Sequence, residues 1–236
     1  MTAVAALLTL ADARLPTGGH AHSGGVEQAI SAGVVIDAET LAGFLDRRLQ
    51  TVGPVAAALA AAACHAVTSQ PRGHADHGDN LDEAAATDRR LAELDAEADA
   101  RTPSPALRTA SRALGRGLAR LGRRAWPNPA WAALAAAPHH SIALGVAAAA
   151  AGVQPAGAAH VAAYLTISGP ATAAQRLLSL DPLTVAAITA ALSASVDAVA
   201  ERAARHPAGP LTAGSDPWFD LLAETHASRE DRLFAS

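Results

Sequence analysis

The feature that most limits how this chain can fold is a glycine-rich corner near its start, between two stretches whose apolar residues have helical spacing. The first stretch ends at Leu15-Pro16 and the second begins at Val26. The corner between them holds four glycines and two histidines: Gly18, Gly19, Gly24, Gly25, His20 and His22. Glycine in the first turn of a helix costs roughly 1 kcal/mol relative to alanine. The pair after Ser23 therefore indicates either a tight helix–helix corner or a place where another backbone or a partner comes close.

The rest of the chain also has helical periodicity, and no stretch alternates as a strand does. Ser104-Pro105, Asn128-Pro129 and Asp181-Pro182 each place a capping side chain before a proline suited to the first helical position. The predicted helices cover residues 3–13, 23–33, 38–52, 54–67, 82–100, 104–125, 129–136, 139–152, 156–169, 171–179, 182–205 and 216–227. Half of the residues are apolar but only 3% are aromatic, so the core must consist of Ala, Leu and Val. Small side chains let helices pack closely, so we predict a compact all-α body, which at 236 residues could be one large domain or two small ones.

Several classes of function are excluded by what the chain lacks. All 18 basic residues are arginines, which rules out a P-loop lysine, Schiff-base chemistry and pyridoxal phosphate. The single cysteine, Cys64, cannot form an internal disulfide. A net charge of −4 gives no reason to expect nucleic acid. The chain has no run of about 20 uninterrupted apolar residues, which a membrane span needs. It also has no basic residue before Arg14, which a signal peptide would need, so we expect a cytoplasmic protein.

Five segments carry a pattern that can be compared with known families. The corner contributes Leu8, Ala11, Asp12, Leu15, Pro16, Gly18, Gly19, His22, Ser23, Gly25, Val26 and Glu27. The later segments are Arg108-x2-Ser111-x3-Gly115, Pro138-His139 with Gly145, Tyr164-Leu165 with Gln175-Arg176-Leu177, and His226 with Arg232-Leu233-Phe234-Ala235-Ser236. In this order they resemble the UreF family of urease accessory proteins over nearly the whole chain. Two places depart from the family pattern: residues 179–182 read Ser-Leu-Asp-Pro instead of Pro-Leu-Gly-Gln, and His20 replaces a usual aromatic residue.

The resemblance implies a protein that is not an enzyme by itself. It implies an accessory protein with one all-α domain over residues 1–236, a compact, irregular, orthogonal bundle of about ten helices, and a homodimer is expected. Its partners would be a UreG-type GTPase, a UreD/UreH-type accessory protein and apo-urease, with no nucleic acid and no membrane. Nickel would be handled by the complex and GTP bound by the GTPase, while this chain would bind no cofactor stably. Positioning the GTPase and favouring one of its nucleotide states would couple hydrolysis to nickel release into urease.

The same resemblance assigns candidate contact residues. Contacts with the UreD/UreH-type partner are assigned to His226 and to the C-terminal tail, residues 228–236, where the named residues are Arg232, Leu233, Phe234 and Ser236. Contacts with the GTPase or a second copy are assigned to Arg14, Pro16, Gly18, Gly19, His22, Ser23, Gly25, Glu27, Arg108, Ser111 and Gly115. The Leu233-Phe234 pair has no local core around it, so the tail either folds back onto the domain or docks onto another protein.

The stretch 104–125 separates its two faces clearly. One face is apolar or small, and the opposite face carries Arg108, Arg112, Arg116, Arg120 and Arg123. This arginine stripe is either a docking face for an acidic partner or GTPase, or a solvated face paired with the acidic stretch over residues 82–99.

Histidines offer possible metal sites, each with a simpler interpretation. His20 and His22 are tentative nickel contacts in the corner, and the His139-His140 pair could also bind nickel, although one buried, hydrogen-bonded histidine at a helix start is favoured. His74-Ala-Asp-His77 lies in a polar stretch, residues 68–80, that we predict to be a flexible, solvated loop. No catalytic constellation is visible. A stand-alone hydrolase and a histidine-bearing nickel storage protein or metallochaperone remain as alternatives.

Overall fold

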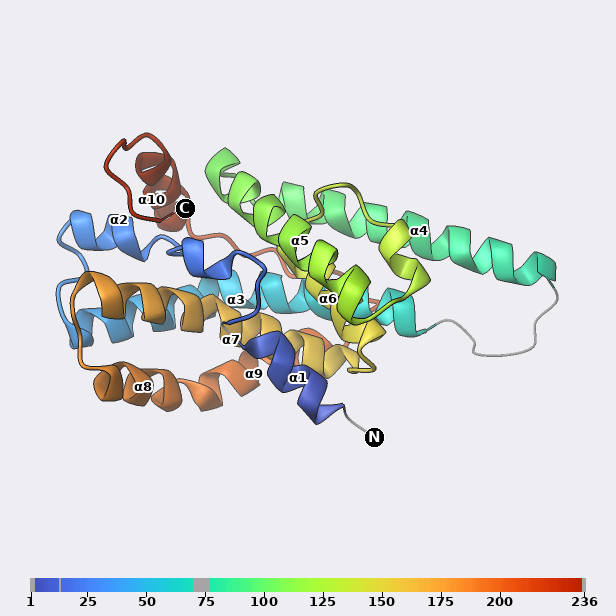
Figure 1. Ribbon diagram of the computed structural model, residues 1–236, viewed down its shortest axis with the longest axis horizontal. Coiled ribbons are helices and arrows are strands. Elements are labelled where there is room, and N and C mark those ends of the chain that lie inside the picture. Colours follow the sequence, from blue (N-terminus) through green and yellow to red (C-terminus); the bar gives the residue numbers. More distant parts are fainter. Residues whose placement is uncertain (1–2, 13, 70–76, 235–236) are drawn as a thin grey trace.

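The computed structural model describes residues 3–12, 14–69 and 77–234, with only the backbone described for 77–81 (Figure 1). Its α-helices are α1 (Val4–Ala11), α2 (Val26–Ser31), α3 (Ala38–Thr68), α4 (His77–Ala100), α5 (Pro105–Ala125), α6 (His140–Ala150), α7 (Pro155–Leu177), α8 (Pro182–Ala191), α9 (Ser193–Ala204) and α10 (Pro217–Ala227). Two 3-10 turns, η1 (Gly19–Ala21) and η2 (Pro129–Ala132), lie in the connections. The predicted all-α fold is confirmed, and no strand occurs in the described part of the chain.

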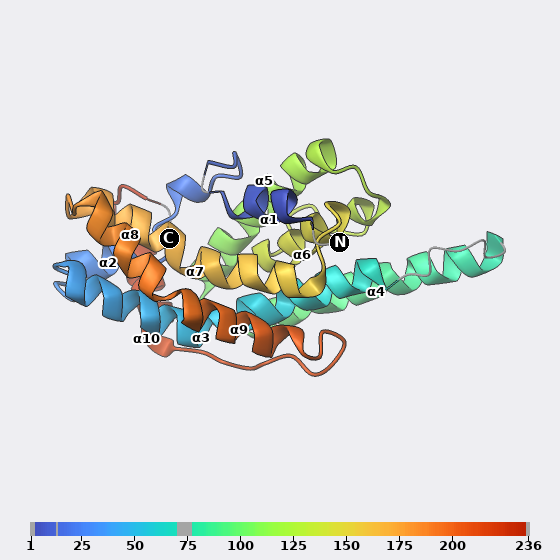
Figure 2. The same cartoon turned by 90° about the horizontal axis from the view of Figure 1, so that it is seen from below.

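The centre of the molecule is α3, which packs against α6, α7 and α9 (Figures 1 and 2). Its buried face begins with Leu41, Leu45 and Leu49 and continues through an alanine run over residues 57–63. Small side chains allow close packing here: a Cβ on Gly145 of α6 would lie 2.5 Å from the carbonyl oxygen of Ala60. The Ala/Leu/Val core expected from the composition is therefore present. By length and apolar composition α3 could cross a membrane, as could α8 and α9 together, but half of the apolar window of α3 is buried inside the fold.

Three predicted helix boundaries are wrong. Residues 38–52 and 54–67 form one helix through Pro54, and 156–169 and 171–179 form one helix, α7, through Pro170. A proline inside a helix loses one backbone hydrogen bond and crowds the preceding turn. Here α3 and α7 lie side by side along much of their length, and we attribute the continuity of both helices to this packing, which outweighs the local penalty. The predicted 182–205 helix instead breaks at Leu192 into α8 and α9.

The capping predictions are confirmed at all three proline junctions. Side-chain oxygens of Ser104, Asn128 and Asp181 accept hydrogen bonds from backbone N–H groups at 3.1, 2.9 and 2.9 Å, respectively. The predicted 129–136 helix is only the short turn η2. The predicted loop over 68–80 is narrower than expected, because α3 runs to Thr68 and α4 begins at His77; residues 70–76 lie outside the described part.

Candidate functional site

The glycine corner packs between α5 and α7. Gly18, Gly24 and Gly25 have φ angles of +92°, +59° and +88°, a region that glycine enters without strain. A Cβ on Gly24 would lie 2.7 Å from the Pro170 side chain of α7. On the other side, the Thr17 carbonyl oxygen lies 2.2 Å from the position of a Cβ on Gly117 of α5. The close approach that the glycines predicted is therefore present, and it is made within the chain.

Directly after the corner, Glu27 of α2 joins the start of the chain to its end. One carboxylate oxygen accepts a hydrogen bond from His226 Nε2 of α10 at 2.8 Å. The same oxygen accepts one from the backbone N–H of Phe234 at 3.0 Å, and the other oxygen accepts one from the N–H of Leu233 at 2.7 Å. Glu27 is 4% exposed and His226 is fully buried. We call Glu27, His226 and the Leu233-Phe234 backbone the tail anchor.

The electrostatics of the tail anchor favour an ionised carboxylate. Burial on its own raises the pKa of Glu27, but the hydrogen bonds from the Leu233 N–H, His226 and the Phe234 N–H outweigh it, and the net pKa is lowered. Because an ionised carboxylate only accepts hydrogen bonds, Nε2 of His226 carries the proton between them. The buried carboxylate of the anchor accepts three hydrogen bonds, one from a side chain and two from the backbone.

The anchor settles how the described part of the tail lies. Its backbone folds back onto the domain, and Phe234 packs against the core. The Leu233 side chain, in contrast, is 79% exposed, and Arg232 is exposed as well. Fold-back of the backbone and outward display of Leu233 therefore occur together, whereas the sequence offered folding back and docking as alternatives. Ser236, also assigned to this contact, lies outside the described residues.

A second group of assigned residues meets at the start of α6. Ser111 Oγ of α5 lies 2.9 Å from Nδ1 of His139 and accepts a hydrogen bond from the backbone N–H of His140 at 3.1 Å. His139 Nε2 lies 2.8 Å from a carboxylate oxygen of Asp99 at the end of α4. Gly115 is buried, and a Cβ there would lie 2.0 Å from the Pro138 carbonyl oxygen. Ser111 and Gly115 thus hold α5 against α6, and His139 is the buried, hydrogen-bonded histidine that the sequence favoured.

The remaining residues assigned to the GTPase or a second copy divide by exposure. Arg14, Pro16 and Gly19 are exposed, and Gly18 and His22 are half-buried. Ser23 and Gly25 are buried, and the Ser23 hydroxyl has no hydrogen-bond partner among the residues described. Arg14 forms an ion pair with Asp12 at 2.8 Å. A partner therefore has direct access to the first half of the corner, before Ser23.

The arginine stripe on α5 is partly paired with α4, as one of the two interpretations expected. Arg112 forms ion pairs with Asp95 at 3.0 Å and Asp99 at 2.5 Å. Arg108 donates to the carbonyl oxygens of Thr102 and Pro103 at 2.7 and 2.9 Å, and Arg123 donates to a carbonyl oxygen of η2. The outer members, Arg116 and Arg120, are exposed and make no ion pair with any described residue. A docking role for this face stays a prediction.

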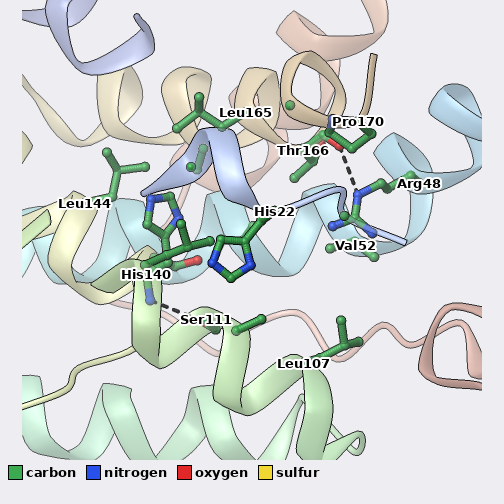
Figure 3. A pocket seen from close by; sticks show the side chains of 18 of the residues that line it. His22, Arg48, Val52, Leu107, Ser111, His140, Leu144, Leu165, Thr166 and Pro170 are labelled. Atoms are coloured by element: carbon green, nitrogen blue, oxygen red, sulfur yellow. Dashed lines mark hydrogen bonds between the residues drawn. The ribbon is translucent and has the colours of Figure 1, made fainter. Parts of the chain in front are cut away.

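Of the histidines proposed as metal contacts, two lie close to one another in the structure. His22 of the corner faces His140 of α6 across a cavity (Figure 3). Burial, followed by the charge of nearby His22, lowers the pKa of His140 to about 4, so this imidazole is neutral at pH 7. His20 is exposed. Among the described residues no group of three or more His, Cys, Asp or Glu side chains could hold a metal ion.

Sequence reasoning missed two features of this region. The pairing of Glu27 with His226 joins residues 199 positions apart, and no spacing rule links such distant positions. The second feature is Arg48 of α3, whose guanidinium enters the same cavity as the two facing histidines (Figure 3). An arginine within an otherwise amphipathic helix gives no local signal that it points inward.

Comparisons with known proteins point to the same family as the five sequence segments. The family model for UreF matches residues 35–193. The chain is 50% identical over 236 residues to a protein of Mycobacterium sp. (strain JLS) and 50% identical to one of Mycolicibacterium vanbaalenii, with full coverage of both chains in each case. It is 45% identical over 240 residues to a protein of Mycobacterium tuberculosis (strain ATCC 25618 / H37Rv), again with full coverage. All three relatives are named urease accessory protein UreF, and their alignments include the corner and the tail that lie outside 35–193.

Proposed function

Because this chain belongs to the UreF family of urease accessory proteins, we propose that it is a non-catalytic adaptor in the maturation of urease. In this proposal it bridges a UreG-type GTPase and a UreD/UreH-type accessory protein. The resulting complex, built on a dimer of this chain in the cytoplasm, couples GTP hydrolysis to the delivery of nickel into apo-urease. Nickel is the cargo of the complex, and the GTPase binds the nucleotide.

The observation that carries this proposal is the tail anchor. Glu27 fixes the backbone of Leu233 and Phe234, yet the Leu233 side chain is 79% exposed. A large apolar side chain on an immobilised backbone is preorganised for docking, because less conformational freedom remains to be lost when a partner binds. Exposed Arg232 beside it supplies the polar rim that such contacts have. We assign this surface to the UreD/UreH-type partner.

The GTPase contact is assigned to the accessible first half of the corner and to the outer arginines of α5. Arg14, Pro16 and Gly19 are exposed in the corner, and Arg116 and Arg120 are exposed on α5. The guanidinium groups of Arg116 and Arg120, which no described carboxylate pairs, suit an acidic protein surface. An adaptor shifts the balance between the nucleotide states of a GTPase only by binding one state more tightly than the other. The coupling therefore requires a difference in affinity between the GTP-bound and GDP-bound forms.

Co-purification with the UreD/UreH-type protein tests the tail assignment. Leu233→Asp and deletion of residues 233–236 should each abolish co-purification, while circular dichroism shows an unchanged helical fold. Leu183→Asp on α8 is the matched control, because Leu183 is also 79% exposed but lies far along the chain from the anchor. Retained co-purification of the Leu233→Asp variant, or equal loss in the Leu183→Asp variant, would contradict the assignment.

The alternative of a nickel-storage protein or metallochaperone predicts more than one tight nickel site per chain in equilibrium dialysis. We expect weak binding or none by the isolated chain, and the described residues offer no cluster that favours storage. A stand-alone hydrolase would turn over simple esters or amides, and we expect no turnover. Unaided GTP hydrolysis by the purified chain would refute the adaptor proposal itself.

A further inference from the structure

A cavity of about 540 Å³ lies between the glycine corner and helices α3, α5, α6 and α7 (Figure 3). Aliphatic side chains form most of its wall, among them Val52, Leu107, Leu144 and Leu165. Its volume is in the range of about 300–1,000 Å³ typical of pockets for small organic ligands. A space of this size with a mostly apolar wall would enclose an aliphatic chain and remove it from water.

One end of this cavity carries an arginine that has no acidic partner. Arg48 Nε donates a hydrogen bond to the carbonyl oxygen of Thr166 on α7 at 3.0 Å (Figure 3). Its guanidinium carbon lies 5.3 Å from the centre of the Phe219 ring, a contact that offsets part of the cost of burying the charge. No carboxylate in the described ranges forms an ion pair with it, whereas neighbouring Arg47 is held by Asp216 at 2.7 Å.

The environment of Arg48 leaves a positive charge in place at neutral pH. Burial lowers the pKa of Arg48 to about 10, and the group therefore stays protonated at pH 7. An ionised side chain taken out of water without a counter-charge is costly. The glycine corner packs closely against this end of the cavity, because a Cβ on Gly24 would lie 2.7 Å from the Pro170 side chain and 3.4 Å from Nη2 of Arg48.

A second polar group in the same cavity also lacks a partner. The Ser168 hydroxyl of α7 is buried, and none of the described residues hydrogen-bonds to it. Buried hydroxyl groups are nearly always hydrogen-bonded in folded proteins. At the other polar patch of the cavity, His140 is neutral, so it adds no second positive charge there. Other charged residues also line the cavity, but Arg14 is paired with Asp12, Arg101 with Glu97, and Asp216 with Arg47, while Arg176 is exposed. The cavity therefore combines an aliphatic wall with the guanidinium of Arg48, which no described carboxylate pairs.

We propose that this cavity binds an amphipathic monocarboxylate, with the carboxylate on the terminal nitrogens of Arg48 and the aliphatic chain along the wall formed by Val52, Leu144 and Leu165. A planar guanidinium fits a carboxylate with two parallel hydrogen bonds, and one positive charge neutralises one negative charge. Arg14, Gly19 and Phe234, which belong to the partner contacts proposed above, also line this cavity, but binding of the ligand to the purified chain requires no partner.

Isothermal titration of the purified full-length chain with straight-chain ligands tests the site. Octanoate should bind at least tenfold more tightly than octanol, which has the same chain length without the charge, and octylamine should not bind. Lengthening the carboxylate from hexanoate to octanoate should raise the affinity about fourfold per methylene, as expected for burial of each group. Equal affinity for octanoate and octanol, or no binding of any carboxylate, would overturn the proposal without recourse to a variant.

A matched pair of variants locates the site. Arg48→Gln should reduce octanoate binding to the level of octanol. Arg47→Gln should leave it unchanged, because Arg47 does not line the cavity and its guanidinium is held by Asp216. Unchanged octanoate affinity in Arg48→Gln would overturn the assignment. Binding of an acidic peptide in place of octanoate would show that the arginine serves a protein partner and would also overturn it.

Discussion

The tail anchor makes a quantitative prediction for the substitution Glu27→Ala. The change removes the acceptor for His226 and for the backbone N–H groups of Leu233 and Phe234, and it leaves the imidazole buried. Removing one member of a buried, hydrogen-bonded charged pair costs about 3–5 kcal/mol. In a chain of this length 1 kcal/mol corresponds to about 2–4 °C in Tm, so we expect Tm to fall by roughly 6–20 °C.

Two assays follow this substitution at different scales. Thermal and urea unfolding at pH 7 measure the loss of global stability. Hydrogen exchange measures the tail itself, because the Leu233 and Phe234 amides should lose protection while the amides of α3 keep theirs in conditions where the fold persists. Glu39→Gln in the exposed first turn of α3 is the control, with an expected change within about 0.5 kcal/mol. Stability within 1 kcal/mol of wild type in Glu27→Ala, with unchanged exchange at both tail amides, would refute the anchor.

The same group predicts a pH dependence. The folded-state pKa of Glu27 lies below its ordinary value of 4.5, so the unfolded chain binds the proton more readily. The stabilisation from ionised Glu27 is therefore fully present above pH 4.5 and is lost as the pH falls through the lowered folded-state pKa. Urea unfolding of wild type and Glu27→Gln from pH 7 to pH 3 should show the two stabilities converging in acid. A stability difference independent of pH would contradict this linkage.

Three further predictions test other parts of the fold. Gly115→Ala should destabilise the chain by about 1–3 kcal/mol or more in urea unfolding, because its Cβ would lie 2.0 Å from the Pro138 carbonyl oxygen, whereas Gly43→Ala in open space on α3 should stabilise by up to about 1 kcal/mol. The pKa of Asp99 is lowered chiefly by its hydrogen bond with the buried imidazole of His139, so NMR titration should give a pKa below the ordinary value of 3.8, and an ordinary value would argue against that bond. Burial raises the pKa of the Cys64 thiol to about 12, so iodoacetamide should alkylate it only after unfolding, as followed by mass spectrometry.

Much of the fold could be predicted because the residues that start a helix lie within one turn of each other in the sequence. Each Ser, Asn or Asp before a proline that we identified caps a helical turn, since capping needs only residues within one turn. The errors came from long-range packing. Pro54 and Pro170 each have a local preference to end a helix, and the contact between α3 and α7 outweighs it. No comparable local signal marks the break at Leu192.

Most residues of the candidate site could be identified from the sequence, but their arrangement in space could not. Glu27 and His226 were both identified from the family pattern, yet nothing in their spacing shows that they touch. Ser111 and Gly115 were assigned to partner contacts, which stay a prediction, and their contacts with the start of α6 could not be read from the sequence. The inward direction of Arg48 also depends on the corner lying over α3 and α7, which only the assembled fold defines.

The separation along the chain between the two sides of the tail anchor has a consequence for biosynthesis. A ribosome adds Leu233 long after Glu27, 206 residues later, so a nascent chain cannot assemble this surface while it is still being made. A partner that reads the displayed leucine on its fixed backbone would bypass unfinished or truncated copies. Recruitment into the complex would then select for polypeptides in which α2 has already packed against α10 and the tail.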